Sequence, residues 1–183
     1  MVIIEITSGG LHFVIDKDGA GRARLIHCSS KPFDKEGYRV ENYSPFHNLL
    51  ELHMLGYDTN DHHASRHTIT SPAWELKYVS HEIAKTQQGQ LLKIYMAYKV
   101  TEVCMHYIFY DNAAIVRSFV EVTNIGEEET TIDYVSSFKF AGLAKDHSQW
   151  DKETYLCIPH GGCQGEMQWR RNSLYQMGLT KYH

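Results

Sequence analysis

Apolar and polar side chains alternate along most of the chain with a period of two, which is typical of β-strands with one buried face. Residues 113–124 show the pattern clearly, with Val116 and Val120 on one face and Glu121 on the other. Phe119 shares the face of Glu121, so we expect that second face to be only partly solvated. Helical periodicity is weak almost everywhere, and the pattern predicts a β protein.

The same alternation predicts further strands in the middle of the chain. It predicts one over residues 72–80, with Trp74, Leu76 and Tyr78 on one side, and another over residues 130–140. Short polar stretches rich in Gly, Asn and Asp separate the alternating runs and predict tight turns. These stretches are residues 17–21, 87–90, 110–112 and 124–129.

About nine or ten strands follow from this pattern, which is too many for one flat sheet of ordinary size. Strands joined by short turns form antiparallel meanders, and two packed sheets bury their apolar faces. We therefore expect an all-β fold, a large antiparallel two-sheet sandwich. Residues 28–48 and 141–153 alternate little and are predicted to be long surface loops. No repeat or linker divides the chain, so we expect residues 1–183 to belong to one domain.

Composition and charge narrow the function classes. The chain has 183 residues and a net charge of -4, with His neutral, which argues against a nucleic-acid partner. No apolar run is long enough to span a bilayer, and the N-terminus does not look like a signal peptide, so we expect no membrane association. The four cysteines are then expected to be reduced thiols in a cytoplasmic protein.

Two segments carry metal-ligating side chains. "CIPHGGC" sets Cys157, His160 and Cys163 three residues apart, but a structural zinc site needs four ligands and no second pair follows. We interpret this segment as a turn that leaves a strand. The histidine-rich run at residues 58–68 lacks a helical pattern and is interpreted as an exposed polar loop. The sequence therefore predicts no metal and no cofactor.

A complete active site is not recognisable from motifs. Glycoside hydrolysis requires an acid and a carboxylate on either side of the scissile bond, whereas the acidic run at residues 127–129 lies in a predicted turn. There is no nucleophile elbow, phosphate loop or dinucleotide fingerprint. We expect no catalytic residues in this chain.

Several segments, taken in order, resemble the N-terminal domain of glycoside hydrolase family 36 α-galactosidases. They are "LLELHMLGYDTNDHHASRHTITS", "WELKYVSHEI", "HYIFYDNAAIVRSFVEVTNIGEEETTIDYVSS" and "IPHGGCQGEMQWRRNSL". The family has a loop of the form Tyr-Gly-x-x-Asp-aromatic-Arg before a strand. That loop is similar to the stretch here containing Tyr57, Asp58, Asp61, His62 and His63, in which His63 stands where the family carries Arg.

The last segment resembles a second family landmark, Leu-x-Gly-Ala-Trp-x-x-Glu followed by tryptophan and basic residues. The matching positions are Gly161, Glu166, Trp169, Arg170 and Arg171. Cys163 stands where the family tends to carry Trp. By this resemblance "CIPHGGC" is a turn of the sandwich and not a metal clip.

The resemblance implies a β-supersandwich set before a (β/α)8 barrel. In the family the barrel supplies the two catalytic aspartates for retaining hydrolysis of terminal α-galactosides such as melibiose and raffinose. The chain then corresponds to an incomplete sandwich, truncated at its C-terminal side, with the barrel expected downstream. We expect such a piece to be inactive alone.

The resemblance also suggests where sugars and partners bind. Several family members form tetramers in which loops of this domain reach toward a neighbour's active site, so a homo-oligomer is expected. Asp61, Asp34 and Trp169 are the candidates for substrate contact, with Trp150 as a further aromatic. Carboxylates accept hydrogen bonds from sugar hydroxyls, and indoles stack on sugar faces.

Two alternatives remain open on the sequence. One is a free-standing carbohydrate-binding or aldose-epimerase-like sandwich, and the other is a non-catalytic assembly module. Sugar mutarotases share a related supersandwich and need a histidine and a glutamate that converge in a groove. His106 and Glu121 are a pair on which that alternative can be tested.

Overall fold

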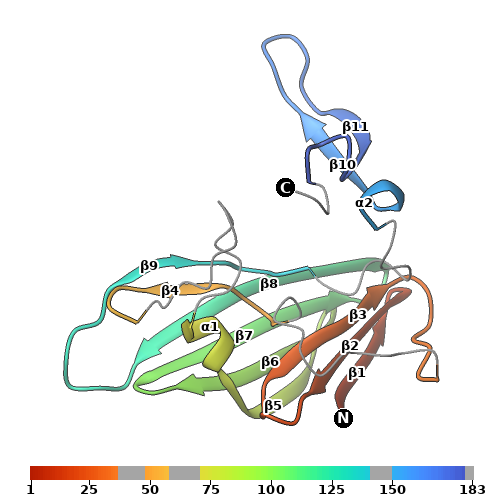
Figure 1. Cartoon of the computed structure of the whole chain (residues 1–183). Helices are drawn as coiled ribbons and strands as arrows, with labels where there is room; N and C mark the ends of the chain where they lie inside the picture. Colours follow the sequence, from red (N-terminus) through yellow and green to blue (C-terminus); the bar gives the residue numbers. More distant parts are fainter. Residues whose placement is uncertain (37–47, 58–70, 141–149, 180–183) are drawn as a thin grey trace. The chain divides into compact units, whose positions relative to one another are not determined.

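The computed structural model describes residues 1–36, 48–57, 71–140 and 150–179 (Figure 1). They belong to two compact units, Met1–Gly142 and Leu143–His183, and each unit is described by itself. The described residues contain eleven strands and two short helices, and every strand pairing among them is antiparallel.

The first unit contains two larger sheets and one short ribbon. The three-stranded sheet has the order β1-β2-β3, the four-stranded sheet has the order β5-β6-β7-β8, and β4 pairs with β9. The bounds are β1 Val2–Ser8, β2 Leu11–Lys17, β3 Ala23–Ser29, β4 Leu52–Met54, β5 Lys77–Thr86, β6 Gly89–Tyr98, β7 Thr101–Tyr110, β8 Ala113–Asn124 and β9 Ile132–Val135. The second unit holds the hairpin of β10 Tyr155–His160 and β11 Gln168–Ser173.

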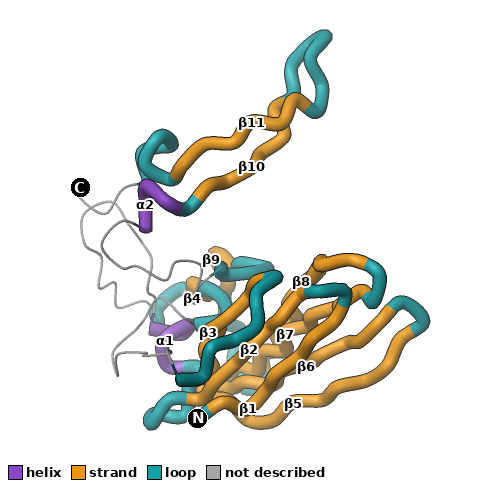
Figure 2. The backbone as a smooth tube through the Cα atoms, turned by 90° about the vertical axis from the view of Figure 1, so that its right-hand side faces the viewer, coloured by secondary structure: helices purple, strands orange, loops and turns teal. Residues whose placement is uncertain are grey.

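The three-stranded and four-stranded sheets form two layers of the first unit (Figure 2). Apolar side chains of both sheets form a common buried core. Phe13 of β2 is fully buried, and its ring centroid lies 5.0 Å from that of Tyr107 and 5.2 Å from that of Phe109, both on β7. Aromatic pairs at these separations add to the stability given by burial alone. This packing confirms the prediction of an all-β antiparallel sandwich.

The period-two pattern correctly predicts which face of the four-stranded sheet is buried. Leu92, Ile94 and Met96 alternate along β6 as buried residues. On β8, Val116 and Val120 are partly buried and pack against the same core. The predicted turns at residues 17–21, 87–90, 110–112 and 124–129 all fall between or directly after strands.

The predicted strand over residues 72–80 is wrong in its first half. Ser71–Glu75 form helix α1, and the strand begins at Lys77. Pro72 fits the first turn of a helix because it has no amide hydrogen to leave unpaired, while its carbonyl accepts a hydrogen bond from the Leu76 amide over 3.1 Å. Trp74 therefore lies on a helix, where its ring stacks 3.5 Å from the Arg22 guanidinium carbon.

The predicted strand over residues 130–140 is shorter in the structure, because β9 ends at Val135. Lys139, within the span predicted as strand, is largely buried and donates hydrogen bonds to the Glu51 carboxylate and to Asn48. Burial lowers the pKa of Lys139 below its usual value, although the Glu51 carboxylate acts in the opposite direction. Lys139 and Glu51 therefore form a largely buried ion pair beyond the end of β9.

The two predicted loops are only partly described. The loop predicted from residue 28 begins later than expected, because Cys28 and Ser29 are the last residues of β3. Residues 30–36 contain no helix or strand, and residues 37–47 lie outside the described residues. Of residues 141–153, the described part is helix α2, Trp150–Glu153, so the prediction of a loop is wrong for these four residues. No helix among the described residues has the length and apolar character needed to cross a bilayer.

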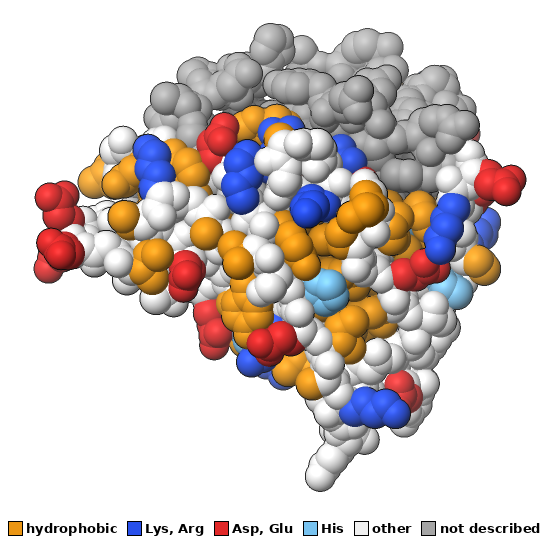
Figure 3. All heavy atoms as spheres, turned by 90° about the horizontal axis from the view of Figure 1, so that it is seen from below, with side chains coloured by type: hydrophobic (Ala, Val, Ile, Leu, Met, Phe, Trp, Pro, Cys, Tyr) orange, Lys and Arg blue, Asp and Glu red, His pale blue; other side chains and the backbone are white. Residues whose placement is uncertain are grey.

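Hydrophobic side chains also lie on the surface of the first unit. Val79, Ile83 and Ile115 are about half exposed or more. Figure 3 shows one face on which hydrophobic side chains are interspersed with acidic, basic and histidine side chains.

Candidate functional site

The structure describes two of the three sugar-contact candidates. Asp61 and the neighbouring residues 58–70 lie outside the described residues. Asp34 follows β3 on the first unit and is exposed, and its Oδ1 accepts a hydrogen bond from the Glu36 amide over 3.2 Å. This local turn holds the carboxylate at the surface, where it can also accept hydrogen bonds from a ligand.

The aromatic candidates belong to the second unit. Trp169 lies on β11 opposite Pro159 of β10 and is 63% exposed, so its indole face is open for stacking. Trp150 begins helix α2. On the same hairpin the Arg171 guanidinium carbon lies 4.2 Å from the Tyr155 ring centroid, so that arginine is held against the ring.

"CIPHGGC" spans the end of β10 and the turn that follows. Cys157 and His160 lie on β10, Cys163 lies beyond the strand, and both thiols are free and exposed. Gly161 and Gly162 have open space where a Cβ would be added. The expected turn that leaves a strand is confirmed.

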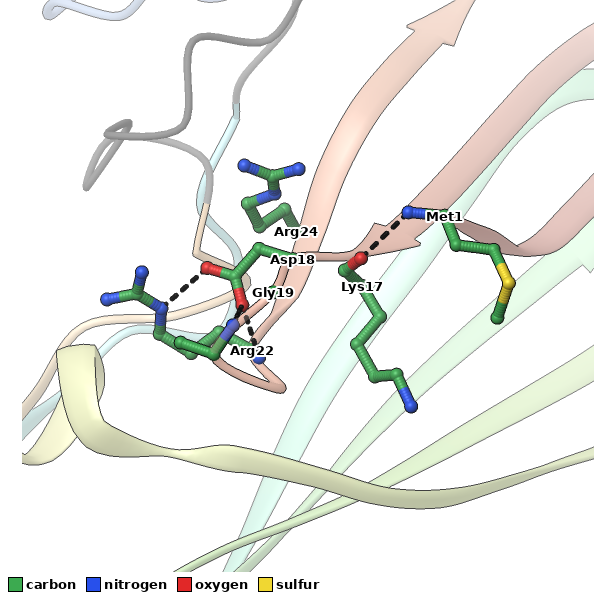
Figure 4. A pocket seen from close by; sticks show the side chains of 7 residues that line it. Met1, Lys17, Asp18, Gly19, Arg22 and Arg24 are labelled. Carbon is green, nitrogen blue, oxygen red and sulfur yellow. Dashed lines mark hydrogen bonds and ion pairs between the residues drawn. The ribbon is translucent and has the colours of Figure 1, made fainter.

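One cavity of the first unit, about 320 Å³, lies beside the β2–β3 turn (Figure 4). Basic side chains predominate in its lining, which is formed by Met1, Lys17, Asp18, Gly19, Ala20, Arg22 and Arg24. Each guanidinium already has a carboxylate partner. Arg22 Nε lies 2.7 Å from Asp18 Oδ2, and Arg24 pairs with Asp16 through two hydrogen bonds. The arginines therefore hold this turn together.

A second cavity, about 400 Å³, lies between the end of β4 and the turn after β8. Its lining is Leu55, Tyr57, Val100, Gly126, Glu127, Glu128, Glu129, Thr130 and Thr131. The three glutamates are exposed, as expected for an acidic turn. An aromatic ring beside carboxylates and hydroxyls matches the chemistry of sugar recognition. Tyr57 belongs to the loop motif on which the family resemblance rests.

A different group of functional side chains lies on the outer face of the four-stranded sheet. Cys104 and His106 are two residues apart on β7 and therefore point to the same face. Across the β7–β8 hairpin, Glu121 is directly opposite Cys104, and Phe119 is directly opposite His106. One ligand atom from each of Cys104, His106 and Glu121 lies within 4.8 Å of the other two. We call these three residues the Cys-His-Glu cluster.

The His106 side chain is fixed on both sides. Its Nε2 lies 2.9 Å from Glu121 Oε2, and its ring stacks on Phe119 with centroids 4.2 Å apart and planes 13° apart. The His106 side chain is only 6% exposed, whereas that of Glu121 is 64% exposed. The cluster therefore has a buried, oriented imidazole and an accessible carboxylate.

Cys104 is partly buried beside a tyrosine from β6. Tyr95 lies directly opposite Cys104 in the register of β6 and β7. Burial raises the pKa of the Cys104 thiol and the charge of Glu121 adds to this, whereas Lys93 and Tyr95 act in the opposite direction. Burial and the neighbouring Glu82 carboxylate raise the pKa of Tyr95. A bound cation would favour the thiolate form of Cys104 over the thiol.

The cluster offers thiol, imidazole and carboxylate ligands for a metal ion. Sequence reasoning paired His106 with Glu121 and missed Cys104. The sequence signal for Cys104 is the Cys-x-His spacing, which puts both side chains on one face of a strand that continues into a tight hairpin. The turn at Asp111 and Asn112, with its register shift between Phe109 and Tyr110, determines which residue of β8 lies opposite Cys104.

The contact between His106 and Glu121 is too close for mutarotase chemistry. In that reaction one group takes the proton of the anomeric hydroxyl while the other protonates the ring oxygen, so the sugar lies between acid and base. Here the two side chains are hydrogen-bonded directly and Phe119 covers the imidazole. Neither of the two cavities described above includes them.

The chain was also compared with known proteins. No protein-family model, no curated protein and no solved structure matches it. The fold and the residues are therefore the basis of the functional proposal.

Proposed function

We propose that the chain is the N-terminal, non-catalytic β-sandwich domain of a retaining α-galactosidase that acts on terminal α-galactosides of the melibiose and raffinose type. The catalytic aspartates belong to a (β/α)8 barrel elsewhere in the full enzyme. The sandwich supports assembly and shapes the entrance to the active site. The observation that carries the proposal is the antiparallel two-sheet sandwich, which is the architecture implied by the family resemblance.

The cavity at Tyr57 gives the proposal a second support. It places an aromatic ring, three exposed carboxylates and threonine hydroxyls around a space of about 400 Å³. In the sequence, Tyr57 directly precedes the segment that contains Asp61, the first sugar-contact candidate. Asp34 and Trp169 remain the other candidates for contact with an α-galactoside.

Hydrolysis assays test this proposal. We expect the native enzyme that contains this sequence to hydrolyse a nitrophenyl α-galactoside with retention of the anomeric configuration. The isolated 183-residue chain should not hydrolyse it. The nitrophenyl β-galactoside is the matched control substrate, and neither protein should act on it. Activity of the isolated chain would contradict a non-catalytic role, and an inactive native enzyme would contradict the assignment.

A mutarotation assay distinguishes this proposal from its main alternative. A free-standing aldose-epimerase-like sandwich would accelerate the mutarotation of galactose, which polarimetry measures directly. We expect the isolated chain to leave that rate unchanged, because the His106–Glu121 contact leaves no place for a sugar between the two groups.

We further propose a cytoplasmic homo-oligomer. All four cysteines are free thiols, as expected in a reducing compartment. Ile132 and Tyr134 of β9 are 41% and 51% exposed, and exposed apolar strands favour association. Sedimentation of the isolated chain should show a dimer or larger species, and a monomer at all concentrations would contradict this part of the proposal.

A further inference from the structure

We propose that Cys104, His106 and Glu121 form a Zn²⁺ site on the outer face of the four-stranded sheet. This site is independent of the α-galactosidase proposal. It involves neither the cavity at Tyr57 nor the three sugar-contact candidates.

The backbone brings the three ligands together. Cys104 and His106 are neighbours on one face of β7, and Glu121 reaches them from the paired strand β8. Their ligand atoms lie within 4.8 Å of one another. In a tetrahedral zinc site with bonds of about 2.0 to 2.3 Å, the ligand atoms are separated by about 3 to 4 Å.

The ligand types select the ion. Thiolate and imidazole favour zinc over magnesium or calcium, which prefer oxygen ligands. Three protein ligands from Cys, His and Glu leave one position of a tetrahedral ion for water or a further ligand. Because Glu121 is 64% exposed, that fourth position faces solvent. The Cys104 thiol loses its proton to solvent when the Cys104–Zn²⁺ bond forms.

The surroundings support the ligands as an outer shell does in known metal sites. Phe119 stacks on the His106 ring and fixes its plane, and Tyr95 of β6 lies directly opposite Cys104 in the sheet register. The stacking with Phe119 and the hydrogen bond to Glu121 hold the His106 ring in place before an ion binds.

Lys93 is the nearby cation. It pairs with His106 in the register of β6 and β7, and its charge acts on Cys104. It also pairs in register with Glu82 on β5, whose carboxylate offsets that charge. With a Glu121 carboxylate and a Cys104 thiolate, the three ligands carry two negative charges, which balance the two positive charges of Zn²⁺.

The test uses the full 183-residue chain without an affinity tag, stripped of metal under reducing conditions. Co²⁺ serves as the spectroscopic probe, because a thiolate-to-cobalt charge-transfer band reports a cysteine ligand directly. Zn²⁺ affinity is then measured by competition with bound Co²⁺. We expect one equivalent of Co²⁺ with a thiolate band, displaced by Zn²⁺, and release of a proton on binding.

Variants identify the ligands. Cys104→Ser should abolish the charge-transfer band, and Glu121→Gln should weaken Zn²⁺ affinity by more than about tenfold, the least effect seen when even an outer-shell partner is lost. A substitution at buried His106 could impair folding, which would make a loss of metal binding uninformative. Glu121 is exposed, so Glu121→Gln tests a ligand without that risk. Circular dichroism of each variant checks the fold.

Matched controls change cysteines and histidines in two other segments of the chain. The double variant Cys157→Ser/Cys163→Ser and the double variant His62→Gln/His63→Gln should both keep the band and the affinity. Absence of a band in the wild-type chain would overturn the proposal. Loss of the band in the Cys157/Cys163 variant, with the band retained in Cys104→Ser, would also overturn it and place the ion at "CIPHGGC". Unchanged affinity in Glu121→Gln would overturn the three-ligand set.

Discussion

Ser8 Oγ donates a hydrogen bond of 3.1 Å to Asp111 Oδ1, across 103 positions of sequence. Ser8 ends β1, and Asp111 lies in the turn between β7 and β8, so this bond joins the two sheets at one end of the sandwich. Gly9 follows Ser8 with φ of +56°, and a Cβ added there would lie 2.1 Å from the Ala113 carbonyl oxygen. The two turns therefore pack backbone against backbone.

This contact predicts different costs for two adjacent glycines. Gly10 also has a positive φ, +84°, but a Cβ there would meet nothing within 4 Å. Both Gly9→Ala and Gly10→Ala incur the strain of a left-handed backbone. Gly9→Ala should lower the free energy of unfolding by about 1–3 kcal/mol more than Gly10→Ala, the usual cost of overpacking. Denaturant unfolding measures both, and equal losses would contradict the close approach of the turns.

Phe13 should be a principal contributor to the core that joins the sheets. It is fully buried and contacts Tyr107 and Phe109 on the opposite sheet. Phe13→Ala should reduce the free energy of unfolding by about 3–5 kcal/mol. Ile115→Ala, at a 55% exposed position of β8, is the matched control and should change it by less than about 0.5 kcal/mol. Similar values for the two variants would show that the sheets do not share this core.

The fold class was predictable because alternation reports burial directly. Val116 and Val120 pack on the core where the period-two pattern puts them. The pattern failed where local chemistry or long-range pairing intervened. Pro72 favours a helix start that alternation does not detect. Lys139 lies beyond the end of β9, where it pairs with Glu51, 88 positions away.

Asp18 should make stability depend on pH in the acid range. Burial would raise the pKa of Asp18, but hydrogen bonds and the charge of Arg22 outweigh it and hold the pKa below 3.8. The ionised form therefore stabilises the fold fully above about pH 3.8, and this contribution is lost as pH falls through the lowered pKa. Its size should be at most about 1 kcal/mol, as for pairs in contact with solvent.

Asp18→Asn isolates this effect. The amide oxygen can still accept the hydrogen bonds of the Ala20 and Arg22 amides, while the charge pair with Arg22 is lost. The stability difference between wild type and variant should be largest near neutral pH and should shrink in acid. Asp133→Asn, at an exposed position of β9, controls for the loss of one carboxylate. If the stability difference between wild type and Asp18→Asn grew as the pH fell, the pKa of Asp18 would not be lowered in the folded protein.

The four thiols should react in a defined order. Burial raises the pKa of Cys28 to about 11 from 9.0, which reduces its thiolate fraction by about 100-fold at neutral pH. Cys157 and Cys163 are exposed, and Cys104 is intermediate. Alkylation followed by peptide mass spectrometry should label Cys157 and Cys163 first, Cys104 later and Cys28 last. Rapid labelling of Cys28 in the folded chain would contradict its burial.

The candidate sites were less predictable than the fold. The pairing of His106 with Glu121 could be guessed, but Cys104 joins them only through the register of the β7–β8 hairpin. Register depends on the turn and on a bulge, which alternation does not define. Asp34 and Trp169 are candidates for sugar contact only through the family resemblance. Their exposure in the structure leaves both accessible to a ligand.

The central claim is that this sandwich belongs to a larger α-galactosidase. The most direct test is the size of the native polypeptide, measured by immunoblot of its source cells with an antibody raised against the 183-residue chain. The account predicts a band several times larger than 21.1 kDa, large enough to include a catalytic barrel. A native band at 21.1 kDa would contradict it.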